Sequence, residues 1–283
     1  MIELEDTYLD IIKKASIGKG FGKKELAKLC DEEIVLVNAF FEGQKNDSLL
    51  KKLSAILELD FKALINHANA RVRPPNIKLE GLAHFQSQFP ISYKEFMWVN
   101  HYIVYDSYTK YAVLIDTGTQ SKKSIDWIKA EGLELKAIFI THQHKDHVYC
   151  LEDFTHLVPN IPIYNMGLNH TKENFQDITP VKNYTFGVLS IQAFETKGHT
   201  PDGLSYLVHG LDQPIVFVGD AIFAHSQGGI ALPDDYASAL KMNNSKILSL
   251  EPNTIIAPGH GPLTTVAHEQ KNNPFYSSLY MTS

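Results

Sequence analysis

Residues 135–148 read LKAIFITHQHKDHV, an apolar run followed at once by a dense group of histidines and one aspartate. Short apolar runs rich in isoleucine and phenylalanine are typical of buried strands, so we expect a strand that leads into the polar residues. His142, His144, Asp146 and His147 then fall within six positions. Imidazole and carboxylate groups together suit zinc and also iron or manganese. The sequence therefore predicts a metal site directly after this strand.

Three further candidate ligands each follow a predicted strand: His199 in TKGHTPDG, Asp220 in VFVGDAIF and His260 in APGHGPLTT. A single histidine or aspartate beside glycine is usually a turn residue, so none of the three indicates a metal by itself. With the first motif they complete a ligand set for two ions about 3.5–4 Å apart, as in two-metal sites. The first ion would take His142, His144 and His199, and the second Asp146, His147 and His260, with Asp220 bridging the two.

Five motifs of this kind follow one another along the chain: LIDTG with Asp116, THQHKDH, KGHTPDG, FVGDAIF and PGHGP. On these motifs the chain from about residue 76 to 283 resembles the metallo-β-lactamase superfamily. The resemblance implies an α+β fold, an αββα sandwich whose two-metal site lies at the sheet edges. It also implies that Asp116 fixes a ligand loop from behind and does not itself bind metal.

Within this superfamily the sequence is most similar to the glyoxalase II branch. Asp220 stands where the true β-lactamases use cysteine or serine, and Phe223 where acyl-homoserine lactonases place a catalytic tyrosine. One departure is the segment FAHSQGGI, which has Gly228 and Gly229 where similar hydrolases reach a glycine and an arginine. We also expect no counterpart of the C-terminal helical domain that holds glutathione in full-length glyoxalase II. The resemblance therefore defines the fold and the metals, but not the substrate.

The activity that the resemblance implies is that of a dinuclear metal-dependent hydrolase. A metal-bridging hydroxide would attack the carbonyl of a small-molecule thioester or ester substrate. Two divalent ions are the expected cofactors, zinc first, with iron or manganese as alternatives, and no residues that bind an organic cofactor are predicted. Asp146 would be a ligand and also the catalytic residue that orients the nucleophile.

Two other functions stay open. A persulfide dioxygenase of the same fold would hold a single iron with His142, His199 and Asp220. The intact second ligand set and the PGHGP motif favour hydrolysis over that reaction. The other alternative is a DNA-binding regulator whose metal domain senses a metabolite.

Residues 1–75 are predicted to be a helical region with its linker, and residues 76–283 the catalytic domain. Short segments with apolar residues at helical spacing alternate with glycine, asparagine and aspartate breakers, and Asp47 and Asp60 are expected N-caps. The two prolines of RVRPPN, residues 71–76, mark the boundary. The helical region resembles the five-helix phage-repressor type of helix-turn-helix domain.

The charge of this region argues against a nucleic-acid partner. Residues 1–70 have 10 lysines, no arginine and 12 acidic residues, a net charge of −2. DNA contact needs phosphate neutralisation and groups that read base edges. The helix that would enter the major groove begins with the acidic DEE and offers only Asn38 as an obvious base-reading side chain. The helices would instead make homo-oligomer contacts or form a lid over the active site.

Composition sets the remaining expectations. With 44% hydrophobic and 20% charged residues the protein is of ordinary globular type, and its net charge of −6 argues against a polyanion partner. Arg71 and Arg73 are the only arginines, so an anionic group bound later in the chain must rely on lysine, histidine, backbone amides or metal. Cys30 and Cys150 are the only cysteines. With no secretory signal or membrane-length apolar run, we expect a reduced, cytoplasmic protein.

Overall fold

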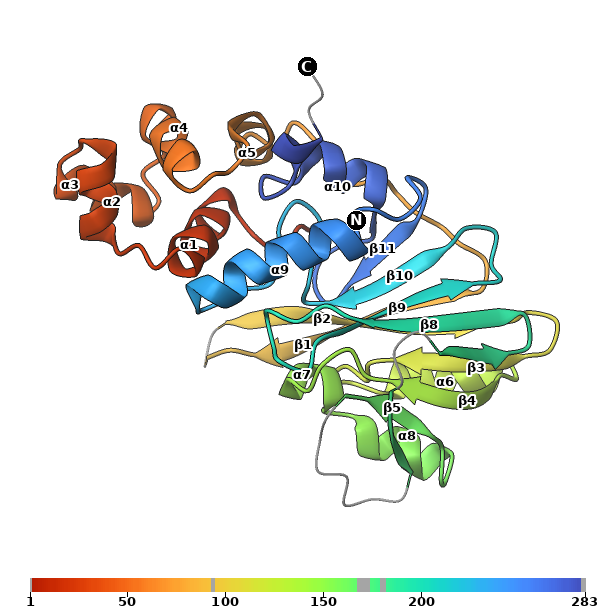
Figure 1. Ribbon diagram of the computed structural model, residues 1–283. Coiled ribbons are helices and arrows are strands. Elements are labelled where there is room, and N and C mark those ends of the chain that lie inside the picture. The colour runs from red at the N-terminus through yellow and green to blue at the C-terminus, as the bar shows by residue number, and fades with distance from the viewer. Residues whose placement is uncertain (1, 93–94, 167–173, 179–181, 281–283) are drawn as a thin grey trace.

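The computed structural model describes residues 2–92, 95–166, 174–178 and 182–280. Figure 1 shows two β-sheets stacked face to face, with helices on their outer faces and a group of helices from the N-terminal region beside them.

The first sheet has six strands in the order of the sequence. They are β1 (Leu82–Pro90), β2 (Phe96–Tyr105), β3 (Tyr111–Ile115), β4 (Glu134–Phe139), β5 (Ile163–Asn165) and β6 (Phe175–Asp177). Strands β1 to β3 are antiparallel, and β3 to β6 are parallel. Strands β2 and β3 form a hairpin around SYTK, with Tyr102 paired to Ile115. The helices of this half are α6 (Lys122–Ala130), α7 (Lys145–Val148) and α8 (Leu151–Leu157).

The second sheet also has six strands, and they too lie side by side in sequence order, from β7 to β12. They are β7 (Asn183–Phe186), β8 (Leu189–Glu195), β9 (Leu204–His209), β10 (Ile215–Gly219), β11 (Ile255–Pro258) and β12 (Thr264–Thr265). Helix α9 (Pro233–Lys246) connects the parallel strands β10 and β11. Helix α10 (Val266–Asn272) and the 3₁₀ helix η1 (Ser277–Leu279) follow.

Alternate residues of the central strands belong to different layers of the core. In β10, Ile215 and Phe217 pack between the two sheets, whereas Val216 and Val218 pack toward α9 and α10. Successive side chains of a strand point to opposite faces, so a continuous apolar run is buried on both sides. A third cluster lies between the first sheet and the helices α6 and α8. The layers are therefore helix, sheet, sheet and helix, and the predicted αββα sandwich is confirmed.

Five helices precede the sheets, as predicted. They are α1 (Tyr8–Gly18), α2 (Lys23–Cys30), α3 (Ile34–Phe41), α4 (Asp47–Ile56) and α5 (Phe61–Ala68). The expected N-cap Asp60 is confirmed, because its carboxylate accepts a hydrogen bond of 2.7 Å from Ala63 N. The expected cap Asp47 is wrong by one position. Asn46 caps α4 instead, because its side-chain oxygen accepts a hydrogen bond from Leu49 N. Asp47 lies in the first turn, where the helix dipole stabilises a carboxylate.

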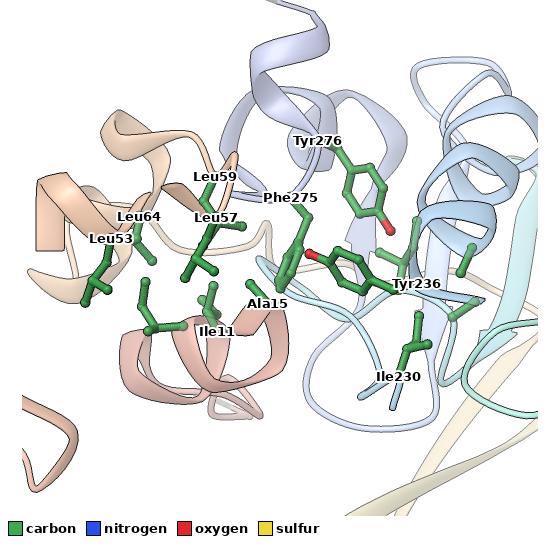
Figure 2. Packing of buried hydrophobic residues seen from close by; sticks show 14 of the residues in the cluster. Ile11, Ala15, Leu53, Leu57, Leu59, Leu64, Ile230, Tyr236, Phe275 and Tyr276 are labelled. Atoms are coloured by element: carbon green, nitrogen blue, oxygen red, sulfur yellow. The ribbon is translucent and has the colours of Figure 1, made fainter. Parts of the chain in front are cut away.

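The N-terminal helices and the β-sandwich share one hydrophobic cluster. Figure 2 shows Ile11 and Ala15 of α1 beside Tyr236 of α9 and Phe275 near the C-terminus. Helix α1 approaches α9 so closely that a Cβ atom on Gly18 would lie 2.2 Å from the Tyr236 ring. The division at residue 75 stays a prediction, and a continuous apolar core crosses it.

Two further findings concern the cysteines and the helices of the described residues. Cys30 and Cys150 are buried free thiols. Within the part of the chain that the structure describes, no helix combines the length and apolarity needed to cross a membrane.

Candidate metal centre

The predicted ligands meet where several strands end at one edge of the sandwich. His142 and His144 follow β4, His199 follows β8, Asp220 follows β10 and His260 follows β11. Strands β8, β10 and β11 run in the same direction, because β8 and β10 are both antiparallel to β9 and β10 is parallel to β11. The topology therefore brings together side chains that are more than a hundred residues apart in the sequence.

Asp116, at the end of β3, fixes the loop that carries the first motif. Its carboxylate accepts hydrogen bonds of 2.8 Å from Thr141 N, Thr141 Oγ1 and His147 Nδ1. Asp116 itself has a φ of +55°, a left-handed conformation that aspartate adopts more readily than most residues. After this anchor α7 begins, with His144 as its N-cap residue. The short helix turns Asp146 and His147 inward, and both are buried.

The first group of ligand atoms comes from His142, His144, His199 and Asp220. Nδ1 of His144 lies 3.1 Å from His142 Nε2 and 3.0 Å from His199 Nε2. His199 Nε2 lies 3.3 Å from an Asp220 oxygen. The four atoms thus surround one point.

The second group comes from Asp146, His147 and His260. His260 Nε2 lies 3.4 Å from Asp146 Oδ2 and 3.4 Å from Asp220 Oδ2. His147 Nε2 lies 3.6 Å from Asp146 Oδ2 and 3.4 Å from Asp220 Oδ1. Asp220 therefore has an oxygen near histidine nitrogens of both groups.

The donor atoms of the second group fit a metal ion. Ligands at about 2.1 Å from a tetrahedral metal lie about 3.4 Å apart, which matches the separations in this group. His147 Nε2, His260 Nε2 and Asp220 Oδ1 are buried and have no hydrogen-bond partner among the described residues. The other ring nitrogens of the two histidines donate to Asp116 and to the carbonyl of Trp98, at 2.8 and 2.6 Å. Each Nε2 therefore presents its lone pair to the cluster, as metal-binding histidines do.

The electrostatics of the site favour positive charge. Burial opposes ionisation of Asp220, but His260 and His147 outweigh it and hold the pKa of Asp220 well below its usual range. Burial also opposes a charged His147, yet Asp116 and Asp220 raise its pKa to about 10. For His142 burial prevails and lowers the pKa well below the usual value, so this imidazole is neutral and can donate its lone pair. The carboxylates therefore stabilise cations at this place, whether protons or metal ions.

The two groups differ in their access to solvent. The side chains of His147 and His260 are 0% and 1% exposed, whereas that of His199 is 20% exposed. His144 is also exposed. A substrate would thus enter over the first group.

Backbone groups that sequence reasoning did not identify complete the site. His199 Nδ1 donates to the carbonyl of Gly229 at 2.8 Å, so the segment without the expected arginine orients a ligand through its backbone. A Cβ atom on Gly259 would lie 2.3 Å from Asp220 Oδ1 and 2.6 Å from His147 Cε1. The glycine before the histidine in PGHGP is the sequence signal for that close approach.

The fold and the arrangement of ligands define the class of the protein. The profile of the family described as "Metallo-beta-lactamase superfamily" matches residues 99–260. That range is more than half of the chain, and the chain belongs to this superfamily.

Individual relatives are covered over most of their own length, and their identity to this chain is modest. The chain is 29% identical over 196 residues to hydroxyacylglutathione hydrolase GloC of Haemophilus influenzae, covering 60% of this chain and 89% of that protein. Among solved structures, the BLEG-1 B3 metallo-β-lactamase is 29% identical with a TM-score of 0.54, covering 68% of this chain and 99% of that one. TTHA1623 in a di-iron-bound form is 26% identical with a TM-score of 0.52, and the shares covered are 68% and 99%.

Proposed function

We propose that the protein is a dinuclear metal-dependent hydrolase of thioesters or esters. The observation that carries the proposal is the pair of ligand groups that share Asp220, with buried nitrogen and oxygen atoms directed at the shared region. Two divalent ions held there would supply an activated water nucleophile at neutral pH and polarise a carbonyl. The di-iron form of the similar protein TTHA1623 supports a two-metal assignment.

Each ligand group would hold one of the two metal ions. The first group would hold one ion, the second group the other, and Asp220 would connect them. Asp146 would also orient the attacking water, because its Oδ2 and an oxygen of the shared Asp220 both lie 3.4 Å from His260 Nε2. Both oxygens of Asp116 are engaged by Thr141 and His147, so Asp116 would position His147 and would not bind a metal.

Glutathione thioesters would be poor substrates. The relative GloC is named a hydroxyacylglutathione hydrolase, and glutathione carries two carboxylates. This chain has no arginine after Arg73, and Lys197, which flanks a ligand motif, pairs with Glu195 at 3.2 Å. A less anionic thioester or ester would therefore be turned over better than S-lactoylglutathione.

The competing functions fit the described structure less well. A single-iron dioxygenase would leave the second group without a role, although its nitrogen atoms are buried and directed inward. A DNA reader would need polar groups on α3, but this helix exposes Val35 by 70% and Ile34 by 37%.

Metal content and a substrate panel test the proposal. The purified protein should contain two metal ions per chain and hydrolyse at least one member of a panel of thioester, ester and lactone substrates. Asp220→Ala should lower both metal content and activity by more than about tenfold, because it removes the shared ligand. Asp212→Ala, a change of an exposed aspartate elsewhere, is the matched control. One iron per chain with oxygen uptake on a persulfide would refute the hydrolase.

A further inference from the structure

A short loop after β10 holds two of the predicted metal ligands through its backbone. This loop, residues 225–229, contributes the Gly229 carbonyl that accepts a hydrogen bond of 2.8 Å from His199 Nδ1. Its Gly228 N–H donates to the carbonyl of Asp220 at 3.0 Å. A Cβ atom on Gly228 would lie 2.1 Å from that carbonyl oxygen and 3.0 Å from His199 Nδ1. The position of the 225–229 loop therefore sets the orientation of His199 in the first ligand group.

The helical region holds this loop from the N-terminal side of the chain. Lys14 of α1 donates from Nζ to the carbonyl of Gln227 at 2.8 Å. The hydroxyl of Ser226 donates to the carboxylate of Asp6, and Lys14 donates to the same carboxylate oxygen. The two contacts with the loop join residues 213 and 220 positions apart in the sequence. The four residues thus form one network that ties the start of α1 to the 225–229 loop.

This network is sufficiently buried to keep one geometry. The side chains of Lys14 and Asp6 are 20% and 8% exposed, and Ser226 is buried. The ammonium of Lys14 also lies 4.7 Å from the centre of the Phe223 ring, a cation–π contact. Hydrogen bonds of charged groups are stronger than those of neutral groups, and salt screens them less when they are partly buried. Lys14 therefore has a defined place between a carboxylate, a carbonyl and a ring.

Residues near the C-terminus hold other parts of the loop. Asn273 Nδ2 donates to the carbonyl of Ser226 at 2.9 Å, and the Tyr276 hydroxyl donates to the side chain of Gln227. The peptide group that follows Gln227 is held differently, at its oxygen by Lys14 and at its nitrogen by the carbonyl of Asp220. Loss of the Lys14 ammonium would thus leave the loop anchored at Ser226 and would loosen the peptide group beside the two glycines.

We propose that Lys14 and Asp6 are positioning residues for the first metal ion. They hold the 225–229 loop in the place where its Gly229 carbonyl fixes the ring of His199. A hydrogen bond from the outer ring nitrogen to a carbonyl fixes the tautomer and the orientation of a metal-binding histidine. The inference rests on the metal centre of the proposed function. It gives the helical region a part in metal binding that does not involve DNA.

The zinc affinity of the full-length protein tests this proposal. Titration of the metal-free protein with Zn²⁺ against a chromophoric chelator gives an affinity for each ion. Removal of a group that directly orients a metal-binding histidine lowers metal affinity about 10- to 100-fold. Because Lys14 acts one bond further away, Lys14→Met should weaken one of the two affinities by about tenfold and change the other by less than about twofold. Ser226→Ala, which removes one hydroxyl, should shift the same affinity in the same direction.

Lys19→Met is the matched control. The Lys19 side chain is 19% exposed, close to the 20% of Lys14, and it pairs with Glu58 of the helical region at 2.9 Å. The two variants should lose similar stability in urea unfolding of the metal-free proteins, but Lys19→Met should keep both zinc affinities. Affinities that change less than about twofold in Lys14→Met, or equally in Lys14→Met and Lys19→Met, would overturn the proposal. If Lys14→Met does not fold, unchanged affinities in Ser226→Ala overturn it.

The ring N–H of His199 gives a readout that a general loss of stability does not move. The Nδ1 protons of His199, His147 and His260 are each held by an oxygen acceptor. NMR of the zinc-loaded protein with ¹⁵N-labelled histidine should show faster exchange of the His199 proton in Lys14→Met and unchanged exchange of the other two. Identical exchange of all three protons in the wild-type protein and the variant contradicts the proposal.

The substrate panel separates this inference from the proposed function. If the zinc-loaded protein hydrolyses no member of the panel, the hydrolase assignment fails. The zinc affinities and the His199 proton still decide the role of Lys14 and Asp6, because neither measurement needs turnover.

Discussion

Acid should weaken the junction between the N-terminal helices and the catalytic half through His225. This residue follows β10, is 1% exposed and has a φ of +63°. His67 Nε2 donates to the carbonyl of Asp6, so His67 Nδ1 is an acceptor and can accept a hydrogen bond of 3.4 Å from the N–H at His225 Nδ1. His225 Nε2 must then accept from His268 Nε2 at 2.7 Å. This series of hydrogen bonds requires His67 and His225 to be neutral, because each accepts through one ring nitrogen and a protonated ring has no acceptor.

The magnitude follows from the linkage between protonation and folding. Burial, with the neighbouring His268 and His67, lowers the pKa of His225 to about 3, whereas an unfolded histidine has a pKa of about 6.5. The unfolded chain therefore binds more protons below pH 6.5, and stability is lost as the pH falls through that value. At pH 5 the loss from His225 alone is about 2 kcal/mol. Burial lowers the pKa of His67 and His268 too, which adds a loss of the same sign.

Glu269 titrates in the opposite direction. Its carboxylate accepts the backbone N–H of His225, and burial raises its pKa to about 7. Its contribution to stability therefore grows as the pH falls from about 7 toward the unfolded value. Lys271 faces His268, and Asp6 and Asp10 act on His67. These groups and the metal ligands are present in any His225 variant, so their titration largely cancels in a comparison of two proteins.

The assay compares wild-type protein with His225→Asn by urea unfolding at pH 7.5 and pH 5.0. Asparagine tolerates a positive φ and does not titrate. The wild-type protein should lose about 2 kcal/mol more than the variant between the two pH values. His209→Gln changes an exposed histidine and should behave like wild type. An equal loss in wild type and His225→Asn would refute the assignment of a neutral buried His225.

Three further changes test the site and the shared core. Gly259→Ala should lower metal content severalfold, because the added Cβ would meet Asp220 and His147. Gly22→Ala is the control, since the space around Gly22 is open, and it should leave metal content unchanged. Elemental analysis of both variants measures the difference. Asp116→Asn should weaken zinc affinity about 10- to 100-fold, measured by competition with a chromophoric chelator, because it disturbs the acceptor for His147 Nδ1. A chain that begins at residue 76 should keep the predicted ligands but melt about 10 °C lower or aggregate, because it exposes the apolar surface that α1 covers. Calorimetry of this chain and of the full-length protein measures the difference in melting temperature.

The ligands that directly follow an apolar strand could be predicted from the sequence alone. The apolar run before His142 predicts a strand, and the residues after it lie at the strand end wherever the sheet places them. Asp220 and His260 could be predicted because each also follows an apolar run directly. The sequence pattern shows which residues end a strand, and the right-handed connections of parallel strands bring those ends to one edge.

The contacts of Asp6 and His225 could not be predicted in this way. Asp6 bonds to Ser226 across 220 positions, and His67 reaches His225 across 158. No periodicity links such pairs, because their contact depends on how α1 and α5 dock on the second sheet. Docking is decided by the fit of side chains in the shared cluster, which a pattern of apolar residues does not specify.

The same docking argues against the use of the helices as a DNA reader. Three of their lysines are engaged within the protein: Lys14 by Asp6, Lys19 by Glu58 at 2.9 Å, and Lys52 by Glu32. A lysine that already neutralises a carboxylate adds little to phosphate binding, and affinity for DNA depends on the number of phosphates neutralised. The apolar side of α1 is likewise covered by α9. The packing of these helices and their paired lysines therefore favour a structural role over DNA binding.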